Sequence, residues 1–326
     1  MLSFERVTKK DVKLAHVFPD ESKKFVAELW YTPKFTGDSQ IVNDDYMTLL
    51  RDEKMRVLND YGLSVAEFEM LVRDLQDTKP VNPDYDRNLK KCYLDLQQTI
   101  ANKLKREFTL DDGHILKLNF DTSKPRQNNI ISAFGSPGCG KSHSVCHTIL
   151  TDRALFHYPK VFLIGSVGED DPSYEPLKKK MGAKYEYHNT ADLPAEMYEM
   201  SFYPRGSCII FDDISSESDR KRKQAVLLMR ERMLSICRHK SLRIWSTEHQ
   251  FFNYRATAKM RNNSKYLFIF PRAIPKTFLD ILEHTFSWKR NKRNAALKLV
   301  QADGRLVVFS LMYPQFFMSP KRLVLL

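Results

Sequence analysis

Apolar residues in the first third of the chain return every three or four positions. This spacing runs from residue 44 to 60 and again from 64 to 75, and it predicts two amphipathic helices. Ser64, at the start of the second helix, is a plausible N-cap, because its hydroxyl group can bond the backbone N–H groups of the first turn. A third helix is predicted from residue 85 to about 106. We therefore expect residues 1–110 to form a helical N-terminal module, which either contacts a partner or packs without a ligand of its own.

Beyond residue 110 the pattern changes to short apolar runs that alternate with helical stretches. Short apolar runs are typical of buried parallel strands, and strands that alternate with helices indicate an α/β fold. A β-hairpin is predicted near the C-terminus, with residues 296–300 and 305–311 joined by a turn at Asp303 and Gly304. Residues 111–326 are thus predicted to form an α/β domain, a mostly parallel sheet flanked by helices, with this hairpin as an antiparallel addition. The predicted core strands cover residues 114–120, 129–134, 160–165, 184–187, 208–213, 242–247 and 266–270.

One apolar run, from Asn129 to Phe134, leads into a glycine-rich turn and then a helical stretch. Gly135, four further residues and then Gly140-Lys141-Ser142 match the P-loop pattern, in which backbone N–H groups surround the phosphates of a nucleotide. The chain has only 11 glycines, and three of them gather here, where a Cβ atom would obstruct a phosphate. An ordinary turn between a strand and a helix is the alternative. The predicted nucleotide-binding residues are Gly135, Ser136, Pro137, Gly138, Cys139, Gly140, Lys141, Ser142 and His143.

A P-loop predicts ATP and Mg²⁺ as cofactors. Lys141 would contact the β- and γ-phosphates, and the Ser142 hydroxyl would ligate the metal. About seventy residues later, the apolar run from Cys208 to Phe211 ends in two acids. In P-loop NTPases, an acid at the end of the neighbouring strand holds Mg²⁺, and a following acid can activate the attacking water. We expect Asp212 to hold the metal and Asp213 to act as general base; the alternative is a strand that ends in a helix-capping aspartate.

Polar residues also follow the apolar run from residue 242 to 247. A polar side chain at the tip of such a strand can contact the γ-phosphate or the attacking water, and so report hydrolysis to the rest of the molecule. Thr247, His249 and Gln250 are the candidates for this role, and their positions in the sequence do not decide among them.

A net charge of +12 and a pI near 9.3 favour a polyanionic partner, either nucleic acid or an anionic membrane surface. Two basic runs, Arg220 to Lys223 and Lys289 to Arg293, are the predicted phosphate-backbone contacts, and a solvated helix face is the alternative for each. No stretch reaches the roughly 18 apolar residues needed to span a bilayer, and the N-terminus lacks the core of a signal peptide. The five cysteines are scattered, without a C-x-x-C pair. We therefore expect a soluble protein of a reducing compartment that is not secreted.

The order of these features resembles the FtsK/HerA class of P-loop ATPases and, within it, the genome-packaging ATPases of double-stranded DNA viruses with double-jelly-roll capsids. The resemblance covers about residues 127–275. It rests on the P-loop and on Asp212-Asp213, Arg238-His239, Gln250 and Arg261-Asn262.

Members of this class form rings, and the resemblance implies a RecA/FtsK-like core in a homo-oligomeric ring, a pentamer or hexamer, that passes double-stranded DNA through its channel. ATP would lie at a subunit boundary, where a neighbour contributes an arginine to the γ-phosphate. Arg261 and then Arg238 are the candidates for this arginine, and each can instead be a DNA contact or a surface ion pair. Gln250 would be the family-like sensor of the γ-phosphate.

The expected function is ATP-driven translocation of double-stranded DNA into a viral capsid, with a capsid protein at the packaging vertex as a further partner. The expected location is the host cytoplasm or a viral factory, or the virion itself. Two alternatives remain. Another DNA motor, such as a helicase or a recombination-associated ATPase, would act without a capsid. An ATP-dependent assembly or scaffold protein would hydrolyse ATP independently of DNA.

Overall fold

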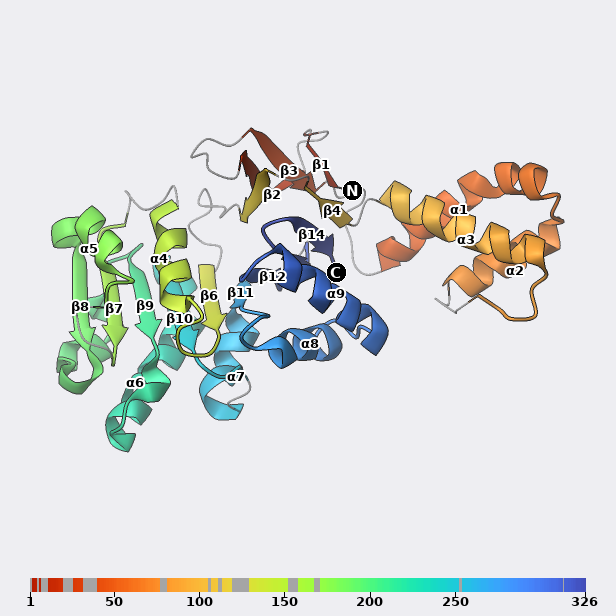
Figure 1. Cartoon of the computed structure of the whole chain (residues 1–326). Helices are drawn as coiled ribbons and strands as arrows, with labels where there is room; N and C mark the ends of the chain where they lie inside the picture. The colour runs from red at the N-terminus through yellow and green to blue at the C-terminus, as the bar shows by residue number, and fades with distance from the viewer. Residues whose placement is uncertain are drawn as a thin grey trace. The chain divides into compact units, whose positions relative to one another are not determined.

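The chain forms two compact units, one made of Met1–Val17 with Phe25–Phe108 and the other of Phe18–Lys24 with Thr109–Leu326. They are seen in a computed structural model, drawn in Figure 1. The model describes residues 2–4, 6, 11–19, 26–31, 40–76, 81–104, 107–110, 113–118, 129–151, 158–166, 171–251, 254–312 and 314–326. Each unit is considered by itself below.

The first unit contains the three predicted helices, α1 (Gln40–Tyr61), α2 (Val65–Gln76) and α3 (Arg87–Leu104). The cap predicted at Ser64 is present, because its hydroxyl accepts from the Glu67 N–H, and the Glu67 carboxylate accepts from the Ser64 N–H at 2.7 Å. The helices enclose a small apolar core. Its fully buried side chains include Leu50, Val57, Leu71, Cys92, Tyr93 and Leu96.

The same unit also contains strands that the sequence pattern did not indicate. β1 (Leu2–Ser3), β2 (Val12–Pro19) and β3 (Ala27–Tyr31) pair antiparallel in the order β1-β3-β2. Lys13 of β2 forms an ion pair with Glu28 of β3 and lies over the Trp30 ring. Cross-strand contacts of this kind stabilise a short antiparallel pair, and they join residues too far apart for local periodicity to reveal.

The second unit is built on a large mixed sheet with strand order β4-β14-β13-β12-β11-β6-β10-β9-β7-β8. Six neighbouring strands of this sheet run parallel, and Figure 1 shows this arrangement; they are β11, β6, β10, β9, β7 and β8. This confirms the predicted α/β fold. The bounds of these strands are β6 (Asn129–Phe134), β7 (Val161–Gly165), β8 (Tyr185–Asn189), β9 (Cys208–Asp212), β10 (Arg243–Glu248) and β11 (Tyr266–Ile269). The outer strands of the second unit are β12 (Val307–Ser310), β13 (Phe316–Met318) and β14 (Arg322–Leu325), and β4 (Glu107–Thr109) covers the point in the chain where the first unit ends. A further strand, β5 (His114–Leu118), is not part of this sheet, so the prediction of a core strand at residues 114–120 was wrong in that respect.

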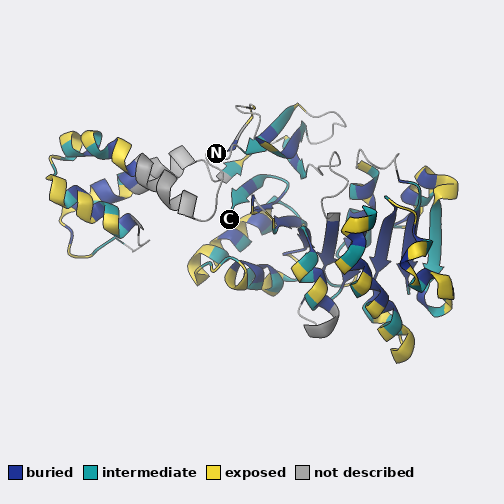
Figure 2. Ribbon diagram, turned by 180° about the vertical axis from the view of Figure 1, so that it is seen from behind, coloured by how far each residue is buried: buried dark blue, intermediate teal, exposed yellow. Residues whose placement is uncertain are grey.

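Helices accompany the sheet and cover its apolar side chains. They are α4 (Lys141–Thr151), α5 (Glu175–Met181), α6 (Arg220–Ile236), α7 (Tyr254–Asn263), α8 (Pro275–His284) and α9 (Arg290–Asp303). Strands β7 and β9 are buried along their whole length, and Figure 2 shows this central part of the sheet as buried. The sheet therefore has the rigid interior needed to hold loops at its edges in fixed positions.

The antiparallel addition at the C-terminus exists, but one of its strands was wrongly predicted. Residues 296–300 lie inside helix α9 rather than in a hairpin strand. Ala296 and Val300 are both buried and lie four residues apart, which is the spacing of one helix face. The antiparallel strands are β12, β13 and β14, and β12 joins the parallel part of the sheet by pairing with β11.

Candidate nucleotide-binding site

The loop from Gly135 to Gly140 joins the central strand β6 to helix α4. Gly138 and Gly140 have φ angles of 73° and 102°, in the left-handed region that favours glycine. Gly135 is constrained by space instead, since a Cβ atom there would lie 2.4 Å from Cys139 Sγ and 3.1 Å from Phe270 Cδ2. Each of the three glycines thus has its own physical reason in this loop.

The motifs that are distant in sequence meet at one edge of the sheet. Parallel pairing places Glu248 of β10 beside Phe134 of β6, and Asp212 of β9 beside Gly165 of β7. The carboxyl ends of β6, β9 and β10 therefore face the start of α4. As a result, the Ser142 hydroxyl lies 3.3 Å from Asp212 Oδ1, although seventy residues separate them.

Asp212 is held by three hydroxyl groups. Its Oδ1 atom accepts hydrogen bonds from Thr247 Oγ1 at 2.6 Å, from Tyr174 OH at 3.1 Å and from Ser142 Oγ. Burial raises the pKa of Asp212 to about 6, and the negative charge of Asp213 adds to this, while the bonds from Thr247 and Tyr174 oppose it. Tyr174 is fully buried at the start of α5, and no sequence pattern pointed to it.

The Ser142 hydroxyl and the Asp212 carboxylate fit a magnesium ion. Mg²⁺ prefers oxygen ligands and keeps several of its waters, so that a serine and one acid are a sufficient protein contribution in nucleotide sites. The raised pKa of Asp212 is physically consistent with this, since a cation would stabilise the ionised form of a buried carboxylate.

The Lys141 side chain is buried at the start of α4, with its ammonium group inside the loop. Its Nζ atom donates to the carbonyl of Gly135 at 3.0 Å and lies 3.4 Å from that of Ser136. It also lies 3.1 Å from His249 Nδ1 and 3.8 Å from Asp213 Oδ2. The lysine is thus positioned where the P-loop pattern predicts a phosphate contact.

Asp213 has a left-handed backbone, with φ 47° and ψ 43°. Such a conformation costs a non-glycine residue about 1–3 kcal/mol and persists only where the surroundings hold it. Here the Asp213 N–H donates to Thr247 Oγ1 at 3.0 Å, and its carbonyl accepts from the hydroxyls of Ser216 and Ser166 at 2.6 and 3.2 Å. Burial raises the pKa of the Asp213 carboxyl, and the positive charge of Lys141 opposes this.

The three candidates for the γ-phosphate sensor have different surroundings, with Thr247 inside β10 and His249 and Gln250 after it. Thr247 is buried and bonds both acids, and His249 contacts Lys141 and Asp213. Gln250 is exposed. Glu248 lies between them in sequence but points to the core, where it forms an ion pair with Arg230 of α6.

Arg261 and Arg238, the candidates for the arginine that a neighbouring subunit contributes, have different surroundings. The Arg261 guanidinium donates to the Phe251 carbonyl at 2.6 Å and to Thr257 Oγ1 at 3.1 Å, and it lies over the Phe251 ring. It therefore fixes the loop after β10 within its own chain. Arg238 is exposed, in the 3₁₀ turn Cys237–Lys240.

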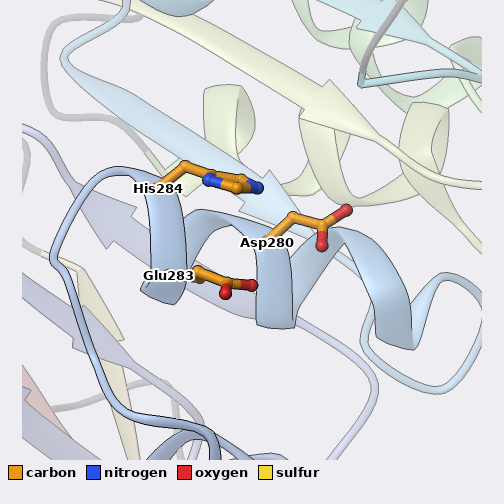
Figure 3. Close-up of side chains that lie close together, drawn as sticks. All are labelled: Asp280, Glu283 and His284. Atoms are coloured by element: carbon orange, nitrogen blue, oxygen red, sulfur yellow. The ribbon is translucent and has the colours of Figure 1, made fainter.

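Another group of possible ligands lies in the described part of the chain, on helix α8. Asp280, Glu283 and His284 place ligand atoms within 4.8 Å of one another, as drawn in Figure 3. Glu283 is ion-paired with Arg293, and Glu283 and His284 are exposed. Residues three and four apart on a helix are neighbours in any case, so that we assign no metal there.

Among the helices that are described, none is long and apolar enough to cross a membrane. No protein-family model matches the chain, and no curated protein matches it.

Solved structures do match. The genome packaging NTPase B204 from Sulfolobus turreted icosahedral virus 2, in complex with ATP-gammaS, matches at 13% identity and a TM-score of 0.37, over 61% of this chain and 99% of that one. ATPases 2 and 3 of Thermomonospora curvata EccC match at 10% identity and a TM-score of 0.35, over 58% and 43% of the two chains.

Proposed function

We propose that this chain is a Mg²⁺-dependent ATPase. The observation that carries the proposal is the convergence of Lys141, Ser142, Asp212 and Asp213 at one edge of the sheet, beside a glycine loop that opens helix α4. Phosphate is favoured at this point because the loop and the first turn of the helix present backbone N–H groups, and because Lys141 adds a full positive charge.

Each residue has a distinct part in hydrolysis. The loop N–H groups and Lys141 bind the β- and γ-phosphates and stabilise the charge that develops during transfer. Ser142 and Asp212 would hold Mg²⁺, which supplies neutralisation of phosphate charge. Asp213 accepts the proton of the attacking water. Thr247 keeps both acids in place through its single hydroxyl group.

We further propose that hydrolysis drives translocation of double-stranded DNA into a viral capsid, by a homo-oligomeric ring with five or six subunits. The net charge of +12 supports a polyanionic partner. Arg220, Lys221 and Arg222 are exposed at the start of α6, where a motor can grip the phosphate backbone without reading bases. In this proposal residues 1–110 are a separate N-terminal module, 111–326 are the motor domain, and a capsid protein at the packaging vertex is a partner.

In the second basic run, Lys289 to Arg293, fewer cations are available to DNA than the sequence indicates. Lys289, Arg290 and Lys292 are exposed, and the Lys292 ammonium lies 3.9 Å from the centre of the Trp288 ring. Arg293 is instead held by an ion pair with Glu283. We therefore assign the proposed DNA contact to the first three cations.

For the arginine supplied by a neighbouring subunit, we now favour Arg238 over Arg261. Arg238 is exposed and so available to a second copy, whereas the Arg261 guanidinium already bonds its own chain. Gln250 is also exposed, and in this proposal it senses the γ-phosphate only if the loop after β10 rearranges on binding.

The test is the steady-state ATPase rate, with and without double-stranded DNA, over a series of salt concentrations. We expect DNA to stimulate the wild type at low salt and the stimulation to disappear at high salt. Lys141→Ala and Asp213→Asn should lose almost all activity, with a residual rate in Asp213→Asn that single-turnover assays can measure. Glutamine substitutions at Arg220, Lys221 and Arg222 should reduce the salt dependence of DNA binding by roughly one unit of log–log slope per lost phosphate contact.

Matched charge removal elsewhere provides the control. Lys179→Gln and Lys184→Gln change exposed lysines of the same unit and should leave that slope unchanged. Hydrolysis that is indifferent to DNA at every salt concentration would overturn translocation and favour an assembly protein. Strand separation without any capsid would favour a helicase.

A further inference from the structure

His249 lies between the two charged groups of the candidate site. Its Nδ1 atom is 3.1 Å from Lys141 Nζ, and its Nε2 atom is 3.3 Å from Asp213 Oδ2. The side chain is about a third exposed, while Lys141 is almost completely buried. The imidazole thus closes the space between the P-loop lysine and the proposed general base.

The chemistry of the neighbours assigns the tautomer of this histidine. A lysine ammonium group has only donors, so that His249 Nδ1 must accept from it. The proton of the neutral ring then sits on Nε2, where it donates to Asp213 Oδ2. The Gly135 carbonyl is 3.3 Å from Nδ1, a longer distance than the 3.1 Å from Nδ1 to Lys141 Nζ. One neutral ring therefore satisfies both neighbours.

The two carboxylate oxygens of Asp213 have different surroundings. Oδ2 faces His249 and Lys141. Oδ1 is buried and accepts no hydrogen bond from the described part of the chain. A buried acceptor without a partner is costly and rare, and at a functional site it marks the atom that a ligand would satisfy. Oδ1 is thus the oxygen that remains to accept a proton from water.

We propose that His249 is a positioning residue for ATP hydrolysis, which fixes the Asp213 carboxylate so that Oδ1 faces the attacking water. The inference rests on the ATPase function proposed above. It explains how an aspartate serves where many ATPases use the longer glutamate: the left-handed backbone of Asp213 and the bond from His249 set the direction of a short side chain. It also links the base to Lys141, the group that contacts the phosphates.

The test compares kcat and KM for ATP, and the Kd for ADP, in a series of variants. We expect His249→Ala to lower kcat roughly 100-fold, the lower end of what general-base catalysis supplies. KM and the Kd for ADP should change less than about threefold, because Lys141 and the loop N–H groups remain. His249→Gln should recover at least about tenfold, since its amide nitrogen can take the place of Nε2 as donor.

A double mutant separates positioning from a general structural effect. If His249 acts through Asp213, adding His249→Ala to Asp213→Asn should cost no further activity. The same additional loss in both backgrounds would overturn the proposal. So would wild-type rates in His249→Ala. His284→Ala, which removes an exposed histidine of α8, is the control and should match the wild type.

These outcomes are distinct from failure of the proposed function. A wild-type chain that binds ADP but hydrolyses no ATP overturns both the ATPase and the role of His249. A wild-type chain that hydrolyses ATP while His249→Ala is equally active overturns only the role of His249.

Discussion

Arg230 of α6 and Glu248 of β10 form an ion pair with both side chains buried, at 0% and 1% exposure. The Glu248 carbonyl also accepts from the Gly135 N–H at 3.2 Å, so that the pair lies directly behind the P-loop. Through this contact helix α6, which begins with the exposed cations from Arg220, is tied to the strand that carries Thr247 and precedes His249. The ion pair therefore anchors the middle of helix α6 to the strand that leads into the nucleotide site.

We predict that replacing one partner of this ion pair lowers the free energy of unfolding more than replacing both. Arg230→Met leaves the Glu248 charge buried without a partner and should lower the free energy of unfolding by about 3–5 kcal/mol. The double variant Arg230→Met, Glu248→Met should recover most of this loss, because two apolar side chains need no compensation. Chemical denaturation of the three proteins measures the difference. Equal losses in the single and double variants would contradict the prediction.

Asp212→Asn should stabilise the metal-free protein at pH 7. Burial raises the pKa of Asp212 to about 6 in the folded chain, from roughly 3.9 when unfolded, so that ionisation opposes folding. The wild type is expected to lose stability as the pH rises from about 4 to 6, by up to about 3 kcal/mol, and the variant should not show this loss. Denaturation midpoints in EDTA from pH 4 to 8 test this.

With Mg²⁺ present, we expect the wild type rather than Asp212→Asn to be the more stable protein at pH 7. The wild type is expected to gain stability when Mg²⁺ is added at pH 7, because the ion compensates the buried charge, whereas Asp212→Asn should gain much less. At pH values well below 6, protons compete with the metal at Asp212, and the gain in the wild type should shrink. A variant that responds to Mg²⁺ as the wild type does would exclude Asp212 as the metal residue.

Thr247→Val should impair the site without changing its shape. The substitution removes one of the three hydrogen bonds to Asp212 Oδ1 and leaves the Asp213 N–H without its acceptor, which costs about 1–3 kcal/mol for that buried group. We expect a lower kcat and a higher Mg²⁺ requirement. Thr247→Ser retains the hydroxyl and should restore both. The control is Thr148→Val on α4, where the hydroxyl donates to the Ser144 carbonyl, a local bond within the helix.

Gly135→Ala should weaken nucleotide binding by crowding the loop from inside. The new methyl group would lie 2.4 Å from Cys139 Sγ and 3.1 Å from Phe270 Cδ2, and such overpacking costs about 1–3 kcal/mol. Adding Cys139→Ala removes the closer of the two contacts and should recover part of the affinity for ADP, measured by calorimetry. If the second substitution brings no recovery, Cys139 is not the obstructing atom.

The sequence by itself determined the parts of this protein whose signals are local. The glycine pattern from Gly135 to Gly140 depends on backbone conformation at each position, and the two acids after Phe211 mark the end of a buried strand. Helical periodicity and the Ser64 cap are set within a few residues. Physical constraints that act between near neighbours in the chain can be recognised without a fold.

Tertiary structure decided everything that depends on which distant residues meet. Parallel register brings Asp212 to Ser142, the core places Tyr174 against the same carboxylate, and the turn after β10 places His249 beside Asp213. The segment 296–300 became helix because Ala296 and Val300 pack on one face against the core. A short apolar stretch fits a strand or a helix equally well, and only the partner it buries against resolves the choice.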